Sequence, residues 1–381
     1  MLGFRHFYSL AAIFALIAIP LWLLSLSGVS YTGGYLSGLF WHSHEMVFGF
    51  ALAVMSGFLL TAVRNWTGLP TPTGLPLAAL ATLWIAGRVL IITGPPILAV
   101  VVDFAFLPLL ILAIARPIIE NRNRRNYKIV ALLVLIALTH GVYHAAAMGP
   151  LPAWLAYTSV ITAMDLITIV LAIVAGRVIP AFTKNAVPES NPRHAGWLEV
   201  LCFGSLVLIA GTKIASDWVA IPVMVPTVLL VVAAVSHAVR LGLWQPHLTT
   251  HNVLLWMMPV AYSWLPVAFV LRALAQYSVV GAAAWIHALT TGAISGFMLA
   301  MMMRSSLGHT GRPLVASGVD MSAFVLLQLA AIIRVAAGFL PAAAYESIVI
   351  LSGAIWTLAF FVFLLRYLPM LIRPRIDGRP G

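Results

Sequence analysis

Charged residues are scarce in this sequence, and this scarcity excludes whole classes of protein. Only 8% of the 381 residues are charged and 62% are apolar, whereas about 25% of residues are charged in an average soluble domain. The mean hydropathy is +1.04. Water could not solvate the surface of so apolar a fold, so we exclude a soluble globular enzyme, a disordered chain and a nucleic-acid binder. The composition predicts a protein surrounded by lipid.

Cysteine and acidic residues are also rare. The single cysteine, Cys202, excludes an intrachain disulfide and a thiolate metal cluster, and its apolar surroundings indicate a small buried hydrophobe. The 21 Lys and Arg exceed the 10 Asp and Glu, but they form no basic stripe. In a membrane protein such an excess sets the orientation instead of binding nucleic acid.

Long apolar stretches dominate what the sequence does contain. A membrane-spanning helix needs about 20 such residues, and twelve segments qualify: 8–27, 44–63, 75–93, 96–116, 128–147, 154–175, 196–215, 222–240, 253–274, 278–303, 320–340 and 344–369. We read the first as a retained helix, not a signal peptide. The sequence therefore predicts an all-α polytopic membrane protein, with about twelve transmembrane helices in one bundle and residues 1–381 forming a single integral membrane domain.

Lys and Arg alternate strongly between the predicted loops. The N-terminus, the even-numbered loops and the C-terminal tail carry almost all of them, for example Arg5, Arg124, Arg312 and Arg375. The positive-inside rule then places both termini in the cytoplasm, which predicts a multi-pass membrane protein.

Histidine is the ionisable residue that stands out, because the chain has 11 of them. Inside a span, such a group is costly unless it is paired, hydrated or bound to something. His42 and His44 lie at the outer mouth of the second span, His140 and His144 share one face of the fifth at i, i+4 spacing, and His287 lies in the outer half of the tenth. Five histidines at one depth predict a metal site, and neutral imidazole suits haem iron and copper. The alternative for each is a histidine bonded to neighbouring helices.

Further charges are predicted inside the spans. His237, late in the eighth span, suits a second metal or an anionic group such as a haem propionate, or else an interfacial polar patch. Arg88, Arg272 and Arg334 fall in outer halves, where the orientation rule disfavours them. We expect a cofactor's carboxylates, or an acidic residue such as Asp103, to neutralise them.

Two acidic residues are candidates for moving protons. Glu45 lies beside the outer histidines, and Asp165 lies mid-span among threonines at helical spacing. The alternative for Asp165 is an interhelical hydrogen-bond seam.

A turn is predicted near residue 310. Gly308 and Gly311 flank His309, for which we predict a structural role, and the adjacent Arg312 could hold an anion.

Several blocks of sequence carry a resemblance to a known family. They include the Trp-His-Ser-His-Glu block, and they occupy residues 4–7, 41–49, 57–68, 87–88, 176–183, 287–290 and 300–313. In these blocks the chain resembles the NnrS family, haem- and copper-containing membrane proteins associated with bacterial nitric oxide responses and denitrification. The resemblance implies twelve helices, haem, copper, nitric oxide and a location in the bacterial inner membrane, but it does not assign ligands.

These observations lead to one main hypothesis and two alternatives. We expect haem, of b type, and copper in a protein that binds nitric oxide and reduces or detoxifies it with electrons from an unknown donor. Binding or sensing without turnover would use the same residues. The alternatives are a twelve-helix secondary transporter without metals and an assembly factor for other metalloenzymes. We expect membrane lipid, but no nucleic acid, as a further partner.

Overall fold

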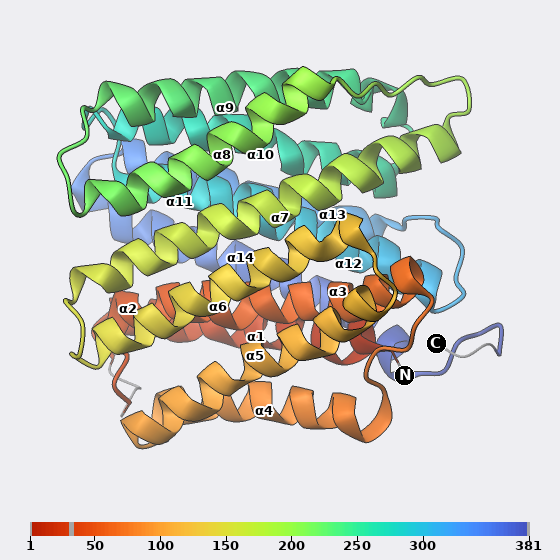
Figure 1. Cartoon of the computed structure of the whole chain (residues 1–381), viewed down its shortest axis with the longest axis horizontal. Helices are drawn as coiled ribbons and strands as arrows, with labels where there is room; N and C mark the ends of the chain where they lie inside the picture. Colours follow the sequence, from red (N-terminus) through yellow and green to blue (C-terminus); the bar gives the residue numbers. More distant parts are fainter. Residues whose placement is uncertain (1, 30–33, 379–381) are drawn as a thin grey trace. The chain divides into compact units, whose positions relative to one another are not determined.

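The computed structural model describes residues 2–29 and 34–378. Within them it contains helices and connecting segments but no strand. The α-helices are α1 (Gly3–Leu26), α2 (Gly38–His44), α3 (Leu52–Thr67), α4 (Gly74–Thr93), α5 (Pro96–Glu120), α6 (Tyr127–Ala147), α7 (Trp154–Ala186), α8 (Gly196–Ser216), α9 (Met224–Leu243), α10 (Val253–Ala275), α11 (Ala282–His287), α12 (Gly296–His309), α13 (Gly318–Ala336) and α14 (Ala342–Ile372) (Figure 1). Two π-helices, Glu45–Ala51 and Ala288–Ser295, join α2 to α3 and α11 to α12.

Twelve helical segments of the described chain are long and apolar enough to cross a membrane, which confirms the predicted all-α, multi-pass fold. Local signals set their ends. Gly94 and Pro95 separate α4 from α5, as the prolines predicted. Gly68 ends α3 with a φ of +71°, and its N–H donates to the carbonyl of Arg64. Most predicted spans agree with the helices to within a few residues.

The sixth span is longer than predicted. We placed its end at residue 175, whereas α7 continues to Ala186 and contains Pro180. A proline removes one backbone hydrogen bond, and membrane helices tolerate this where neighbouring groups satisfy the freed carbonyl.

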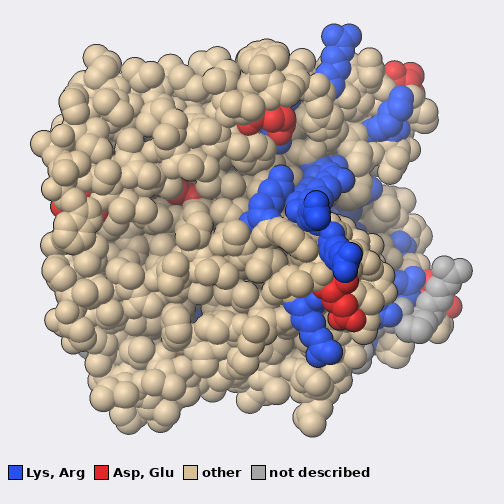
Figure 2. Space-filling model, in the orientation of Figure 1, with Lys and Arg blue, Asp and Glu red and all other residues tan. Residues whose placement is uncertain are grey.

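The outward-facing surface is apolar, as lipid contact requires. Large apolar side chains such as Ile97, Val200 and Val325 are exposed along the helices, and water would solvate so many of them poorly. Figure 2 shows a face that is almost free of charge over most of its area, with Lys and Arg gathered toward one side.

The described chain forms two compact units. Unit 1 comprises residues 1–166, 305–312 and 363–381, and unit 2 comprises residues 167–304 and 313–362. In unit 1, α1 packs on α3, α4 and α6 pack on α5, and α5 also contacts α3. In unit 2, α9 packs between α8 and α10, and α10 contacts α11 and the following π-helix. The single integral membrane domain stays a prediction.

Candidate metal centre

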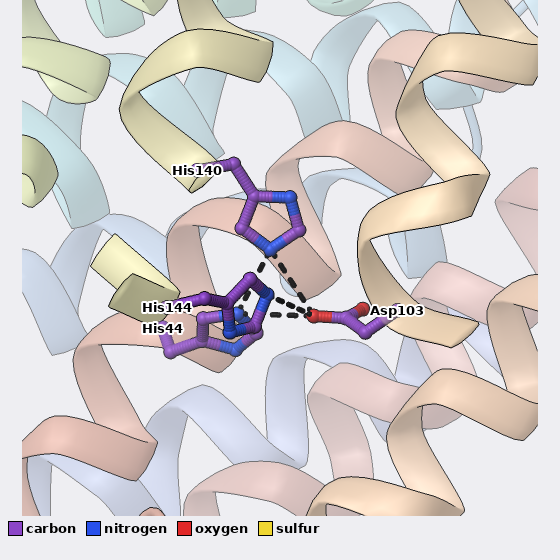
Figure 3. A group of neighbouring side chains, drawn as sticks. All are labelled: His44, Asp103, His140 and His144. Atoms are coloured by element: carbon purple, nitrogen blue, oxygen red, sulfur yellow. Dashed lines mark hydrogen bonds and ion pairs between the residues drawn. The ribbon is translucent and has the colours of Figure 1, made fainter. Parts of the chain in front are cut away.

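Four buried side chains of unit 1 converge on one point. His44 ends α2, Asp103 lies on α5, and His140 and His144 lie one turn apart on α6 (Figure 3). One potential ligand atom from each residue lies within 4.8 Å of all the others. We call these four residues the His3Asp cluster.

The distances within the His3Asp cluster are those of a coordination site. The Nε2 atoms of His44, His140 and His144 each lie 3.1 Å from the same oxygen, Oδ2 of Asp103. The Nε2 atoms of His44 and His140 are 3.0 Å apart. Ligand atoms around a tetrahedral ion with bonds of about 2.0–2.1 Å are separated by about 3.3 Å. These four distances are therefore close to those that a bound ion would impose, and the remaining two, from His144 to His44 and to His140, are within 4.8 Å.

Glu45 determines which nitrogen of His44 faces the cluster. Its Oε1 lies 3.0 Å from Nδ1 of His44, and an ionised carboxylate can only accept a hydrogen bond. The proton of a neutral His44 is therefore on Nδ1, and the lone pair of Nε2 points at Asp103. This arrangement is the usual outer-shell contact of a metal-binding histidine.

Arg88 joins the two carboxylates of the site. Its Nη1 donates to Oε2 of Glu45 at 2.8 Å, and its Nη2 forms an ion pair with Oδ1 of Asp103. All three side chains are buried. Two carboxylates and one guanidinium leave a net charge of −1, which a cation bound at the cluster would offset.

The backbone around the site makes these contacts possible. The π-helix Glu45–Ala51 begins directly after His44, and such segments often occur at functional sites. A Cβ on Gly49 would lie 2.6 Å from Nη1 of Arg88, and one on Gly87 would lie 2.9 Å from Oδ1 of Asp103. Both glycines therefore leave the space in which the ion pairs of Arg88 form.

Aromatic side chains fix the orientation of the imidazoles. Phe48 stacks on His140 with ring centroids 4.4 Å apart. The hydroxyl of Tyr35 lies 2.6 Å from Nδ1 of His144, and Tyr143 donates to the carbonyl of Phe40 while its ring packs against His44. These contacts hold the rings in place before any ligand binds.

The donor set suits a single metal ion better than it suits haem iron. Haem iron already has four porphyrin nitrogens and accepts one or two axial ligands, so three imidazole nitrogens and a carboxylate at one point do not fit haem. Imidazole and carboxylate do suit a copper, zinc or non-haem iron ion. The His3Asp cluster is therefore suited to a single ion without a porphyrin.

Comparison with known proteins identifies the family of this chain. The family model described as NnrS protein matches residues 1–375, nearly the whole chain. The chain belongs to the NnrS family. Membership indicates a membrane protein of the nitric oxide response, and the His3Asp cluster is a possible metal site in this member. A comparison with curated proteins finds no match.

Two of the five histidines that we grouped in this NnrS protein lie outside the His3Asp cluster. His42 precedes His44 on the same short helix, so the two rings diverge, and His42 stacks on Trp22 with centroids 4.6 Å apart. His287 lies in unit 2 at the end of α11, and its Nδ1 donates to the carbonyl of Ala283 at 2.8 Å. Their roles as ligands stay predictions.

The other intramembrane charges have protein contacts of their own. Arg272 lies over the ring of Trp285 at 4.5 Å, and Nη2 of Arg334 donates to the hydroxyl of Tyr345 at 3.0 Å. Asp165 is buried in α7. Of the three arginines predicted to contact a cofactor, Arg88 is the one that contacts residues of the His3Asp cluster.

His237 lies in a separate buried cluster of unit 2. Its Nδ1 lies 2.6 Å from the hydroxyl of Tyr262, which also accepts a hydrogen bond from Arg240. Arg240 forms a two-pronged ion pair with Glu199, through Nε at 2.8 Å and Nη2 at 2.7 Å. Nε2 of His237 is buried and forms no hydrogen bond of normal geometry within the described chain, although the backbone of Cys202 lies near the imidazole.

Sequence reasoning missed Asp103 as a possible ligand, and it missed Tyr35 and Tyr143 altogether. Asp103 was considered only as a countercharge for the outer arginines, although an acidic residue inside a span is itself a signal of function. The tyrosines carried no comparable signal, because their contacts depend on how the helices pack.

Proposed function

We propose that this protein holds a copper ion at the His3Asp cluster and binds nitric oxide there. The observation that carries the proposal is the convergence of three Nε2 atoms on one oxygen of Asp103, each at 3.1 Å. Family membership supplies the link to nitric oxide. Nitric oxide is small, uncharged and soluble in lipid, so it can reach a site within a membrane protein without a channel.

The surrounding residues have distinct tasks in this proposal. A bound copper ion supplies a coordination position for nitric oxide. Asp103 contributes the negative charge nearest to the ion, and Glu45 keeps His44 in the tautomer whose Nε2 can bind. Arg88 pairs with both carboxylates and offsets part of their negative charge. Glu45 thus acts as a positioning residue, and its role as a proton donor stays a prediction, as does that of Asp165.

We further propose that haem, where the protein carries it, binds through His237. A buried imidazole with one nitrogen bound to Tyr262 and the other without a hydrogen bond of normal geometry in the described chain has the arrangement of an axial ligand. Copper and haem then bind in different units.

We also propose that the protein lies in the bacterial inner membrane, with both termini in the cytoplasm.

Nitric oxide reduction remains the expected activity at this centre. Converting two molecules of nitric oxide to nitrous oxide consumes two electrons and two protons, so turnover requires an electron donor. Binding or sensing of nitric oxide would use the same ligands but would need no electron donor. Turnover assays with a chemical reductant separate these two cases.

Metal analysis and spectroscopy of single variants test the proposal. We expect purified wild-type protein to contain copper, and its Cu(II) form to give an electron paramagnetic resonance spectrum with nitrogen couplings that nitric oxide alters. His140→Ala and His144→Ala should remove copper and leave haem, whereas His237→Ala should remove haem and leave copper. His194→Ala, at an exposed histidine, should change neither. A folded wild-type protein free of transition metals would contradict the proposal and favour the transporter hypothesis.

A further inference from the structure

Two sequence blocks at opposite ends of the chain meet in unit 1. Arg5, near the start of α1, donates through Nη1 to the carbonyls of Met370, Leu371 and Arg373, at 3.2, 2.9 and 2.5 Å. These carbonyls lie at the C-terminal end of α14, or directly after it in the case of Arg373. The last carbonyls of a helix have no partner within the helix, so a nearby cation is favourable. One nitrogen of Arg5 thus caps a helix that lies more than 360 residues away in sequence.

The turn after α12 joins the same region. The ring of His309 packs against Phe4 with centroids 5.4 Å apart, and the carbonyl of His309 accepts from Nη1 of Arg375 at 3.0 Å. Arg312 follows in the turn. Its positive charge and that of Arg375 both repel the charge of Arg5. We call Arg5, Arg312 and Arg375 the basic cluster.

The unused edge of Arg5 is the feature that points to a ligand. The side chain is 97% buried, and its Nε and Nη2 have no hydrogen-bond partner among the described residues. Nε and Nη2 form the edge of a guanidinium that binds an oxyanion with two parallel hydrogen bonds. Arg375 uses this edge for Asp377, through Nε at 2.8 Å and Nη2 at 2.5 Å, and Arg240 uses it for Glu199.

Arg312 supplies a further buried donor that lacks an acceptor. Its Nη1 is buried and, within the described chain, has no hydrogen-bond partner. A buried donor without a partner is costly, and more so when it is charged. The three guanidinium groups and the carboxylate of Asp377 leave a net charge of +2, so the missing partner is an anion.

A tetrahedral oxyanion suits these donors better than a carboxylate does. The edge of Arg5 alone would occupy both oxygens of a carboxylate, whereas a phosphate has further oxygens for Arg312. Arg5 is the third residue of a membrane-spanning helix, which is the depth of lipid headgroups. We propose that the basic cluster binds a phosphate group, either of an anionic phospholipid or of free phosphate, through Arg5 and Arg312.

Binding to the purified full-length protein tests this proposal with two probes. The first is inorganic phosphate, titrated calorimetrically in detergent at constant ionic strength. The second is phosphatidylglycerol, offered in phosphatidylcholine nanodiscs, with retention on the protein measured by native mass spectrometry. Specific binding of inorganic phosphate identifies free phosphate, and specific retention of phosphatidylglycerol identifies the lipid.

Two variants and a matched control make the test decisive. Arg312→Gln should weaken binding of the effective probe by about ten- to a hundredfold, the effect of one hydrogen bond to a charged group. Arg64→Gln makes the same change at an exposed arginine and should leave binding unchanged. Asp377→Asn, at a partly exposed side chain, should strengthen binding, because it removes a negative charge beside the basic cluster and so raises the attraction of the cluster for a phosphate.

Three results would overturn the proposal. They are the absence of binding of both probes to wild type, equal losses in Arg312→Gln and Arg64→Gln, and weaker binding in Asp377→Asn. Because Asp377→Asn lies outside the helices and changes affinity in the opposite direction, a folding defect in Arg312→Gln cannot explain both effects. The metal content of all three variants should equal that of wild type, so the outcome is independent of the proposed copper site.

Discussion

Replacing Asp103 by asparagine should greatly reduce the affinity of the His3Asp cluster for its ion. Asparagine keeps the size of the side chain and one ligand oxygen but removes the negative charge. The charge of the two carboxylates and Arg88 then changes from −1 to zero. Two unit charges 4 Å apart interact by about 4 kcal/mol at an effective dielectric constant of about 20, which for a singly charged copper ion corresponds to about a thousandfold loss of affinity.

The assay for this variant is competition with a chelator of known affinity, followed by mass-spectrometric metal analysis. Arg88 keeps its bond to Glu45 at 2.8 Å, so we expect the variant to fold, and gel filtration checks this. Asp217→Asn is the matched control, because Asp217 pairs with Lys213 at 2.6 Å in unit 2. If folded Asp103→Asn bound copper as tightly as the control, the carboxylate would not be a ligand and the charge argument would be wrong.

Two further substitutions test the local packing. Gly87→Ala should destabilise the protein by about 1–3 kcal/mol and lower its metal content, because the new Cβ would lie 3.1 Å from Cα of Asp103. Gly204→Ala is the control, because a Cβ there meets nothing within 4 Å. Thermal unfolding should show the control to be neutral or stabilising. His42→Ala should retain full metal content, because His42 stacks on Trp22 outside the His3Asp cluster. Loss of copper in folded His42→Ala would place that histidine in the site.

The membrane helices were predictable because the lipid environment constrains them so strongly. A span must be long, apolar and internally hydrogen-bonded, and all three requirements leave a visible mark in the sequence. What the sequence did not show was the end of α7, because Pro180 and the polar residues after it also suit a loop. The division into two compact units was likewise not visible, since no linker or change of composition marks it.

The candidate site was only partly predictable, for a geometric reason. The i, i+4 spacing of His140 and His144 reveals that they share a face, and sequence alone can supply such local relationships. The approach of Asp103 depends on how α5 packs against α4 at Gly87. His44 depends on the π-helix that follows it, and the sequence gives no sign of this departure from regular geometry.

A proton is the alternative to a metal as the bridge within the His3Asp cluster, and the contacts argue against it. If Nε2 of His44 were protonated, it would donate to Asp103, and His140 could not also carry a proton on its Nε2, since the two nitrogens are 3.0 Å apart. The proton of His140 would then be on Nδ1, which is buried and has no hydrogen-bond partner in the described chain. If the proton of His44 is on Nδ1 instead, as the contact with Glu45 requires, the lone pair of Nε2 faces the carboxylate of Asp103 at 3.1 Å. Either neutral form of His44 therefore leaves a repulsive pair or an unpaired buried donor. A cation between the four atoms removes the repulsion at their centre, because it turns three facing lone pairs and a carboxylate into four favourable contacts.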